Sequence, residues 1–483
     1  MKSHFEFSLE ERNLLKAVYS FAKTHKVRPY IVGGILRDIL LGREKENPDI
    51  DFCIKKGAIN FGRQLAREIK AGFVVLDKEH GACRLVRKAK DKIYTLDFTD
   101  FRGKDLEDDL RHRDFTINAL ALEWPRGTLI DPCSGAADLA RKIIRVPDKG
   151  AFIEDPLRIL RAFSFSSLLG FKIQKETLHL ARQAKKLLSK VSCERIRDEL
   201  FKLLDSRNSY EYFQALDKLG ILKIILPEIE LMRGVAQGPY HNLGVWEHSL
   251  EALRQFEAVV EEFKKNSFIH AHLEEEISCL RPRRSLIKLA MLLHDVGKPG
   301  TMRREGKKLT FHGHEHLSWD IGVEIARRLK LSNDELDALR KMIVNHLRPG
   351  YLADQGILTP RAKFRYFRDT GIEAPSVLLI SLADQRATRG RLTTKESRAR
   401  HEKTVSVLLR EYFKQRGQKK VTRLLNGDDL IKIFKLQPSP LIGRILSEIE
   451  ELQAIGRIKN KDGALKISAG LIKKTKAKNE KKE

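Results

Sequence analysis

The sequence predicts an N-terminal α/β domain followed by a body that is mostly α-helical. Up to about residue 150, short apolar runs rich in β-branched or aromatic residues, such as RPYIV, DIDFCI, GFVVL and IYTLDFT, are typical of strands. From Glu154 onward strand signals nearly vanish, and amphipathic helical patterns follow one another, as in VSCERIRDELFKLL and LIKLAMLLHD. A chain of 483 residues is too long for one compact core, so several domains are expected.

Local signals place the first helix, the linkers and the tail. Ser8 followed by Glu11 is a capping box, and apolar residues at helical spacing extend this helix to about Lys23. The basic stretch 281–284 and the polar stretch 415–420 are predicted to be surface linkers. The last residues, KKTKAKNEKKE, are too charged to bury, and we expect them to be disordered.

The composition narrows the class of partner and the compartment. Lys and Arg total 92 against 65 acidic residues, a net charge of +27, which favours a nucleic acid partner over the alternative of a merely lysine-rich surface. Five scattered cysteines without a CxxC pair argue against a disulfide framework and against a thiolate zinc site. There is no apolar leader and no run of about 18 apolar residues, so we expect a cytoplasmic protein with no membrane partner.

A glycine pair follows the first predicted strand and opens a helix-like run. Gly33 and Gly34 would let backbone amides approach a triphosphate at a helix N-terminus. Shortly downstream, strand alternation puts Asp49 and Asp51 on one face while Ile50 points into the core. Two convergent carboxylates can hold Mg²⁺, which prefers oxygen ligands and substrate phosphates.

A third carboxylate would complete a two-metal site, in which the ions stabilise both the attacking hydroxyl and the leaving pyrophosphate. Asp97, on the polar face of the predicted strand YTLDFT, is the candidate, and a solvated strand aspartate is the alternative. The glycine pair, Arg37 and the two upstream aspartates together favour nucleotide binding, because that function accounts for every polar position at once.

Five ordered motifs carry a resemblance to a known family. They are VGGILRDILLG, DIDF, RHRDFTINALAL, DPCSG and EDPLRILRAFSF, and they resemble the class II tRNA nucleotidyltransferase and bacterial poly(A) polymerase family. The resemblance covers roughly residues 28–205, and more loosely NGDDL at 426–430. It implies a polymerase-β-like head with magnesium ligands at Asp49 and Asp51. It also implies CTP and ATP as substrates and a tRNA or other RNA 3′ end as partner.

The resemblance assigns roles to residues around the expected nucleotide. Gly34, Arg37 and Arg113 are implied to contact the incoming nucleotide. Asp114 and Asn118 are implied to shape the ribose side of the pocket and to help prefer a 2′-hydroxyl. An aspartate and an asparagine are suitable ribose partners, although a turn cap would use them equally well.

The segment EDPLRILR begins a helix, with acidic residues ahead of a proline in its first turn. Glu154, Arg158 and Arg161 could form a surface salt-bridge ladder, but the resemblance makes the segment an amino-acid template in which Asp155, Arg158 and Arg161 bind the nucleotide. Asp155 and Arg158 would read the base, because a carboxylate accepts from an amino group while a guanidinium donates to a ring nitrogen or carbonyl.

Three departures from the family pattern affect the predicted specificity. The first of two arginines before Asp114 is His112 here, and Ser164 stands where a third arginine is common. The connection DFRGKDLEDDLRH is short, whereas relatives that add a complete CCA usually carry a longer flexible loop there. We therefore expect CC addition rather than full CCA addition, with poly(A) synthesis as the alternative. An HD phosphohydrolase with an RNA-binding head is the alternative from another class.

Nine of the fifteen histidines lie between His241 and His346, and their order resembles that of HD-domain metallophosphohydrolases. Imidazole and carboxylate ligands suit Mn, Ni, Co, Fe or Zn better than Mg, and such a metal can activate water against a phosphoester. The resemblance implies hydrolysis of 2′,3′-cyclic phosphates or 2′-nucleotides, or trimming of damaged RNA ends. The expected ligands are His248, His294, Asp295, His316, His346 and Asp384.

These observations predict four domains. They are a nucleotidyltransferase head at 1–150, a helical neck with base- and RNA-binding elements at 151–235, an HD phosphohydrolase-like domain at 236–400, and a helical RNA-binding body with a basic tail at 401–483.

Overall fold

A computed structural model describes residues 5–43, 47–89, 92–278, 281–306, 308–416 and 423–479. The chain forms two compact units, residues 1–206 with 215–225 and residues 207–214 with 226–483. The head and the neck predicted as separate domains thus share one unit, and the four-domain division stays a prediction. Among the described residues, no helix is both long and apolar enough to span a membrane. All four cysteines that the structure describes are free, in line with the expected absence of disulfides.

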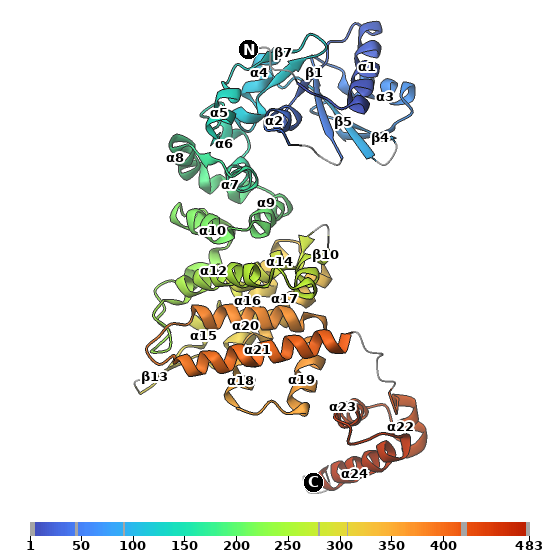
Figure 1. The fold of residues 1–483 in the computed structure, drawn as a ribbon, viewed down its shortest axis with the longest axis vertical. Helices are drawn as coiled ribbons and strands as arrows, with labels where there is room; N and C mark the ends of the chain where they lie inside the picture. Colours follow the sequence, from blue (N-terminus) through green and yellow to red (C-terminus); the bar gives the residue numbers. More distant parts are fainter. Residues whose placement is uncertain are drawn as a thin grey trace. The chain divides into compact units, whose positions relative to one another are not determined.

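The first unit is built on a seven-stranded sheet in the order β3-β4-β5-β2-β1-β6-β7. Figure 1 labels four of its strands, β1, β4, β5 and β7. Strands β2 and β5 pair in parallel and the other neighbours are antiparallel, which confirms the predicted α/β head. The strands are β1 (Tyr30–Val32), β2 (Asp49–Ile54), β3 (Gly72–Asp77), β4 (Ala82–Ala89), β5 (Lys92–Asp100), β6 (Ala121–Glu123) and β7 (Thr128–Ile130).

Helices cover the apolar face of this sheet. Phe52 of β2 stacks on Phe98 of β5 with centroids 4.7 Å apart, and Phe61 of α3 packs on Phe98 at 5.3 Å. Because side chains alternate along a strand, the residues between these aromatics face the opposite, polar side. The predicted capping box of the first helix is present. The helices of the head are α1 (Leu9–Thr24), α2 (Gly34–Leu40), α3 (Ala58–Glu68), α4 (Leu106–Arg111) and α5 (Gly135–Arg141).

A helical neck completes the first unit, and in it α7 packs against α9. A short parallel pair, β8 (Ile143–Ile144) with β9 (Lys172–Ile173), ties the neck to the end of the head. The neck helices are α6 (Ala151–Glu154), α7 (Arg158–Leu169), α8 (Lys175–Ala184), α9 (Cys193–Asp205) and α11 (Leu222–Ile225), and the residues of α10 (Ser209–Lys218) divide between the two units.

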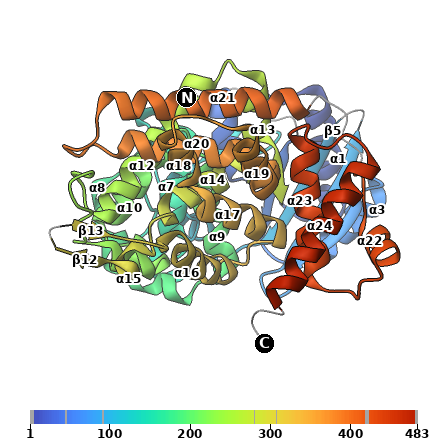
Figure 2. The same ribbon diagram turned by 90° about the horizontal axis from the view of Figure 1, so that it is seen from below.

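The second unit is helical, as predicted, and α20 lies at its centre with α12, α17 and α21 packed around it (Figure 2). Two small hairpins, β10 (Glu276–Ser278) with β11 (Arg281–Pro282) and β12 (Arg303–Glu305) with β13 (Lys308–Thr310), interrupt the helices. The helices are α12 (Val245–Phe263), α13 (Ser267–Glu274), α14 (Arg283–Leu293), α15 (Lys298–Thr301), α16 (His314–Arg328), α17 (Asn333–Asn345), α18 (Arg348–Asp354), α19 (Pro360–Thr370), α20 (Ala374–Ala387) and α21 (Lys395–Arg416).

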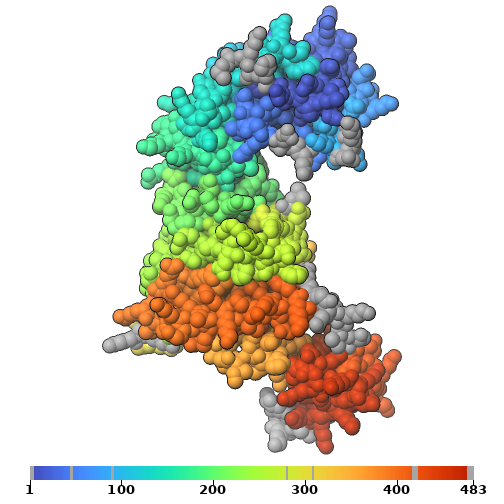
Figure 3. Space-filling view, viewed as in Figure 1, coloured from blue at the N-terminus to red at the C-terminus, as the bar shows by residue number. Residues whose placement is uncertain are grey.

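The C-terminal segment has a small core of its own, formed by α22 (Gly427–Phe434), α23 (Pro440–Ala454) and α24 (Lys461–Asn479) and drawn in red in Figure 3. Two expectations need correction. The 281–284 stretch is no linker, because it pairs as β11 and opens α14 with Arg283 buried. Residues 473–479 of the predicted tail continue α24 rather than being disordered, since this helix is anchored ahead of them by the buried Ala464 and Ile472, and residues 480–483 lie outside the described residues. Most of the linker predicted at 415–420 lies outside the described residues.

Candidate active site and metal centre

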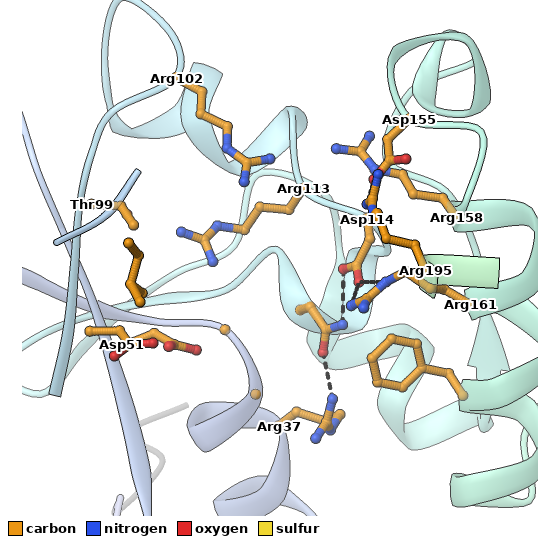
Figure 4. Close-up of a pocket in the computed structure, with 16 residues that line it drawn as sticks. Arg37, Asp51, Thr99, Arg102, Arg113, Asp114, Asp155, Arg158, Arg161 and Arg195 are labelled. Carbon is orange, nitrogen blue, oxygen red and sulfur yellow. Dashed lines mark hydrogen bonds and ion pairs between the residues drawn. The ribbon is translucent and has the colours of Figure 1, made fainter. Parts of the chain in front are cut away.

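A cavity of about 500 Å³ lies on the polar side of the head sheet, between the sheet and the neck helices (Figure 4). Eleven of the twelve expected nucleotide and catalytic residues line it: Gly33, Gly34, Arg37, Asp51, Asp97, Arg113, Asp114, Asn118, Asp155, Arg158 and Arg161. The remaining lining residues are Leu76, Thr99, Arg102, Phe165 and Arg195. The site therefore joins residues that lie up to about 160 positions apart in the chain.

Carboxylates from two neighbouring strands meet at the floor of the cavity. Asp51 of β2 is the parallel-register partner of Asp97 of β5, so both side chains leave the same face of the sheet. Asp49 is exposed at the start of β2, on the same face by alternation, and is not among the lining residues. Arg84 of β4 binds both oxygens of Asp97, with Nε–Oδ1 at 2.8 Å and Nη2–Oδ2 at 2.7 Å. A metal ion at Asp97 would have to compete with this bidentate pair.

Gly33, the first residue of the glycine pair, lies close to the Asp51 carboxylate. Gly33 has a φ of +77°, and a side chain there would place its Cβ 3.0 Å from Asp51 Oδ2 and 3.4 Å from Arg113 Nη1. Only glycine meets both the backbone and the spatial requirement. Gly34 then begins α2.

A buried polar network holds the nucleotide side of the cavity. Arg37 donates to Asn118 Oδ1 at 2.8 Å, and Asn118 donates to Asp114 Oδ1 at 2.9 Å. Arg161 pairs with Asp114 Oδ2 at 2.5 Å and also lies 3.7 Å from Glu199. Burial alone would raise the pKa of Asp114, but Arg161 and the hydrogen bond from Asn118 outweigh it and lower that pKa. Asp114 is thus an acceptor that stays ionised, and the dashed contacts in Figure 4 follow this chain.

Asp155 and Arg158, the residues expected to read the base, have different partners in the structure. Arg158 is buried and donates to His112 O at 2.7 Å, to Ala151 O at 3.2 Å and to Glu154 Oε2 at 2.7 Å. Asp155 instead accepts from Arg195 at 2.8 Å. The guanidinium paired with Asp155 is therefore that of Arg195, whereas Arg158 is held by other partners.

Arg195 is a lining residue that the sequence interpretation missed. It lies in the first turn of α9, where the helix dipole disfavours a cation. The pairing with Asp155, 40 residues away, offsets that cost, and no local sequence pattern marks Arg195 as part of the site. Ser164, the departure on α7, is buried and donates to Leu160 O at 3.3 Å and Glu199 O at 3.4 Å, so it packs between α7 and α9 and offers no phosphate contact.

A second cluster lies within the helical unit, where five of the six expected metal ligands converge. The Nε2 of His248, on α12, lies 2.8 Å from Asp384 Oδ1 on α20 and 3.7 Å from Asp295 Oδ2. The Nε2 of His294, at the end of α14, lies 3.2 Å from Asp295 Oδ2 and 3.6 Å from Asp384 Oδ1. The Nε2 of His346, at the end of α17, is 3.9 Å from Asp295 Oδ1.

The sixth expected ligand, His316, is a correction. Its side chain is 71% exposed, whereas His314 is buried with Nε2 3.2 Å from Asp295 Oδ1. Helix α16 begins at His314, and residues two apart on a helix point about 200° apart, so only one of the pair can face the cluster. The order of the histidines in the sequence located the segment, but the start of α16 decides which histidine turns inward.

The side chains of this cluster fit a transition metal. Within the described residues, the buried His294 Nε2, His314 Nε2 and Asp295 Oδ1 atoms have no hydrogen-bond partner, which is costly unless a cation binds them. The Nδ1 atoms of His294, His314 and His346 contact the backbone carbonyls of Met291, Phe311 and Ile343 at 2.7–2.9 Å, which turns each Nε2 toward the centre.

Two pKa shifts bear on metal binding. Burial lowers the pKa of His346 to about 3, so its imidazole is neutral and ready to ligate. Burial also opposes the charge on His294, but Asp295 and Asp384 outweigh it and raise the pKa of His294 to about 10. A cation entering this centre would therefore displace a proton from His294.

Comparison with known proteins decides the family. The head of the chain, residues 29–145, matches the "Poly A polymerase head domain" family. Residues 170–232 match an RNA and SrmB-binding region of polymerase A, residues 245–389 match the HD domain, and residues 405–468 match tRNA nucleotidyltransferase domain 2. The A-adding tRNA nucleotidyltransferase of Deinococcus radiodurans is 31% identical over 438 residues, which span 89% of this chain and 92% of that protein.

The chain belongs to the class II tRNA nucleotidyltransferase and poly(A) polymerase family. Another relative, the CC-adding tRNA nucleotidyltransferase of Geobacter sulfurreducens, is 30% identical, and the match spans 94% of both chains. Among solved structures, a tRNA-processing enzyme matches at 25% identity with a TM-score of 0.59, covering 83% of this chain and 96% of that one. The Thermotoga maritima CCA-adding enzyme complexed with tRNA shares the fold at a TM-score of 0.63, with 22% identity and 96% coverage of both chains.

Proposed function

We propose that this chain transfers nucleoside monophosphates from CTP, and in the alternative also from ATP, to the 3′-hydroxyl of tRNA, with release of pyrophosphate. The observation that carries the proposal is the meeting of Asp51 and Asp97 at the floor of a cavity whose other walls carry arginines. Relatives described as A-adding and CC-adding tRNA nucleotidyltransferases span almost the whole chain and support the choice of tRNA.

The head residues divide the task of transfer. Asp49 and Asp51, with Asp97, would hold Mg²⁺, which when bound lowers the barrier to attack by the terminal hydroxyl and stabilises the leaving pyrophosphate. Arg37 and Arg113 neutralise the triphosphate and hold it in line with the hydroxyl. No side chain of the cavity has to act as a nucleophile.

Asp114 and Asn118 supply a fixed acceptor and donor beside the ribose, because their positions are set by Arg161 and Arg37. An acceptor held in place by the protein hydrogen-bonds a 2′-hydroxyl, and a 2′-deoxynucleotide leaves it unpaired. We therefore propose that this pair selects ribonucleotides.

We further propose that the chain adds CC rather than the full CCA. In the described structure, the short connection between β5 and Arg113 is occupied by α4 and pinned at its start, with Arg102 N donating to Asp109 Oδ1 at 3.0 Å and Lys104 N donating to Asp108 Oδ2 at 3.0 Å. Changing the specificity of the pocket from cytosine to adenine requires Asp155 and its neighbours to shift. A short connection held by these hydrogen bonds has little freedom to drive that shift. The comparisons do not choose, because A-adding and CC-adding relatives are about equally similar.

The test offers the purified protein one tRNA ending at the discriminator base and another ending in CC, each with CTP, ATP or both, and sizes the products to one nucleotide. We expect two cytidines on the first tRNA and then a stop, with no product on the second. Completion to CCA, or a single adenosine on the second tRNA, would reject CC addition and keep the family chemistry. A long adenosine ladder on unrelated RNA would identify a poly(A) polymerase.

Asp51→Ala and Asp49→Ala should abolish every product while leaving tRNA affinity within severalfold, because the metals serve chemistry more than RNA binding.

A second activity is favoured by the buried cluster of the helical unit. We propose that it is a metal-dependent phosphohydrolase site that acts on 2′,3′-cyclic phosphates or 2′-nucleotides. Among the described residues, the buried imidazole and carboxylate atoms without a hydrogen-bond partner support this proposal, because such ligands bind metals that activate water against phosphoesters. The double variant His294→Ala with Asp295→Ala should lose metal-dependent hydrolysis and keep nucleotide addition. Loss of both activities in a folded variant would contradict two separate sites, and His316→Ala, at an exposed histidine, is the matched control.

A further inference from the structure

The outer strands of the head sheet present apolar side chains on the same face as the carboxylates of the site. Val74 of β3 is the register partner of Arg84 of β4, and Arg84 is in turn the partner of Asp97 of β5. Because register partners point to the same face of a sheet, Val74 lies on the face that carries Asp97. Val74 is 54% exposed and Leu76 is 50% exposed, and Leu76 lines the cavity. An apolar edge of the sheet therefore continues the floor of the cavity.

Arg102, in the connection that follows β5, brings an unpaired positive charge to the same cavity. It is one of six arginines in the lining, and each of the other five pairs with a carboxylate: Arg37 with Asp38, Arg113 with Asp109, Arg158 with Glu154, Arg161 with Asp114, and Arg195 with Asp155. The Arg102 guanidinium has no carboxylate partner among the described residues, while its backbone N–H donates to Asp109 Oδ1 at 3.0 Å and anchors the connection. Figure 4 shows the Arg102 side chain directed into the cavity. This guanidinium is therefore available to an external anion.

The strand order indicates which part of the reaction takes place at this edge. Strands β5, β4 and β3 lie on one side of β2, and β1 lies on the other, followed by the turn at Gly33. The triphosphate is proposed to bind at that turn, where Arg113 Nη1 lies 3.4 Å from a Cβ built on Gly33. In an in-line transfer, the 3′ oxygen bonds to the α-phosphorus from the side opposite to the departing pyrophosphate. The acceptor end is therefore expected over β5, β4 and β3.

We propose that Val74 and Leu76 seat the 3′-terminal nucleoside of the acceptor RNA, and that Arg102 binds the phosphodiester on the 5′ side of that nucleoside. This inference rests on the transferase function proposed above and assigns the residues that hold its acceptor. A guanidinium can bind a phosphate through two parallel hydrogen bonds. Phosphate and apolar contacts of this kind carry no base identity. They suit an acceptor whose terminal base changes from the discriminator to cytosine as nucleotides are added.

The test combines Arg102→Gln with a tRNA whose last phosphodiester is replaced by an uncharged methylphosphonate. The kcat/KM for the acceptor and the KM for CTP are measured for both proteins on both tRNAs. In the wild type, the uncharged linkage should lower kcat/KM for the acceptor about tenfold, because a charge-assisted hydrogen bond is lost. Arg102→Gln should cause a similar loss on the ordinary tRNA and little further loss on the modified one, since both changes remove the same contact. The KM for CTP should stay at the wild-type value.

The apolar half of the seat has its own variant. Leu76→Ala should raise the KM for the acceptor severalfold and leave the KM for CTP unchanged, because it removes apolar surface that the terminal nucleoside would cover. Leu76→Met keeps a similar apolar volume and should restore the wild-type KM. The controls are Arg111→Gln, on α4 in the same connection, and Leu9→Ala, at a residue that is 67% exposed on α1. Neither control residue lines the cavity, so both variants should match the wild type.

The outcomes separate this inference from the transferase function. A raised KM for CTP in Arg102→Gln, or losses from the variant and the methylphosphonate that simply multiply, would overturn the contact between Arg102 and the acceptor while the transferase function stands. Wild-type acceptor kinetics in Leu76→Ala would likewise overturn the apolar seat. Failure of the wild type to add any nucleotide to the ordinary tRNA would overturn the transferase function and this inference with it.

Discussion

Replacing Gly33 with alanine separates the two demands that the turn before α2 places on this residue. The first is the backbone, since Gly33 has a φ of +77° and a ψ of −142°, close to a region that only glycine populates readily. The second is space, since the new Cβ would lie 3.0 Å from Asp51 Oδ2. Gly42, just beyond the other end of α2, has a φ of +65°, and no described atom lies within 4 Å of a Cβ built there. Gly42→Ala is therefore a control for the backbone demand alone.

The two demands predict different magnitudes. A non-glycine residue held at such angles costs about 1–3 kcal/mol, so both variants should lower the free energy of unfolding by that order. Only Gly33→Ala also crowds the Asp51 carboxylate, which is proposed to bind Mg²⁺, and either Asp51 or the turn must move by a few tenths of an ångström. Since a displacement of about 1 Å near reacting atoms can cost roughly a hundredfold in rate, this shift should lower the rate of addition by on the order of tenfold.

The assay measures single-nucleotide addition to tRNA at saturating CTP across a Mg²⁺ titration, beside urea denaturation of the same samples. Gly33→Ala should add nucleotides about tenfold more slowly and need more Mg²⁺, whereas Gly42→Ala should add them at the wild-type rate despite its lower stability. Equal addition by the two variants would refute the idea that the glycine is required by Asp51.

Two further predictions follow from charges in the same cavity. Arg84→Gln frees Asp97 from a bidentate pair worth up to about 1 kcal/mol, so the Mg²⁺ concentration for half-maximal addition should fall up to about fivefold; an unchanged or higher requirement would exclude Asp97 as a metal ligand. Asp114→Asn breaks a largely buried pair with Arg161, and should cost on the order of 2 kcal/mol at neutral pH. Because the pKa of Asp114 is lowered by folding, its contribution is present above about pH 4 and is lost as the pH falls through the lowered value, so urea denaturation of the wild type and the variant should converge in acid.

Features of the site that depend on local periodicity could be predicted from the sequence. Alternation along β2 placed Ile50 and Phe52 in the core and Asp51 on the polar face, as the structure has them. The glycine pair was predicted to let backbone amides approach a triphosphate, and the structure adds that Gly33 has a positive φ and lies close to Asp51. Such features can be read from neighbours in the chain, because the strand itself fixes which way each side chain points.

Features that depend on tertiary partners could not be predicted in this way. Arg84 holds Asp97 across two strands, and Arg195 reaches Asp155 from 40 residues away, so neither pairing leaves a local pattern. The choice of His314 over His316 depends on where α16 begins, and helix boundaries are the least certain part of any assignment from sequence. The 281–284 stretch looked like a basic linker because its burial depends on distant acids such as Glu335, which pairs with Arg281.

Two of the three departures from the family pattern, His112 and Ser164, contact residues of the neck. His112 accepts a hydrogen bond from Arg158 through its carbonyl oxygen, and Ser164 packs between α7 and α9, the helix that carries Arg195. The third departure, the short connection after β5, contributes Arg102 to the lining of the cavity. Phosphoryl transfer needs the same metals and triphosphate contacts for CTP and ATP, whereas the choice of base is proposed to depend on Asp155 and Arg158 of the neck. We infer that the chemistry resides on the sheet side of the cavity and the choice of nucleotide on its neck side.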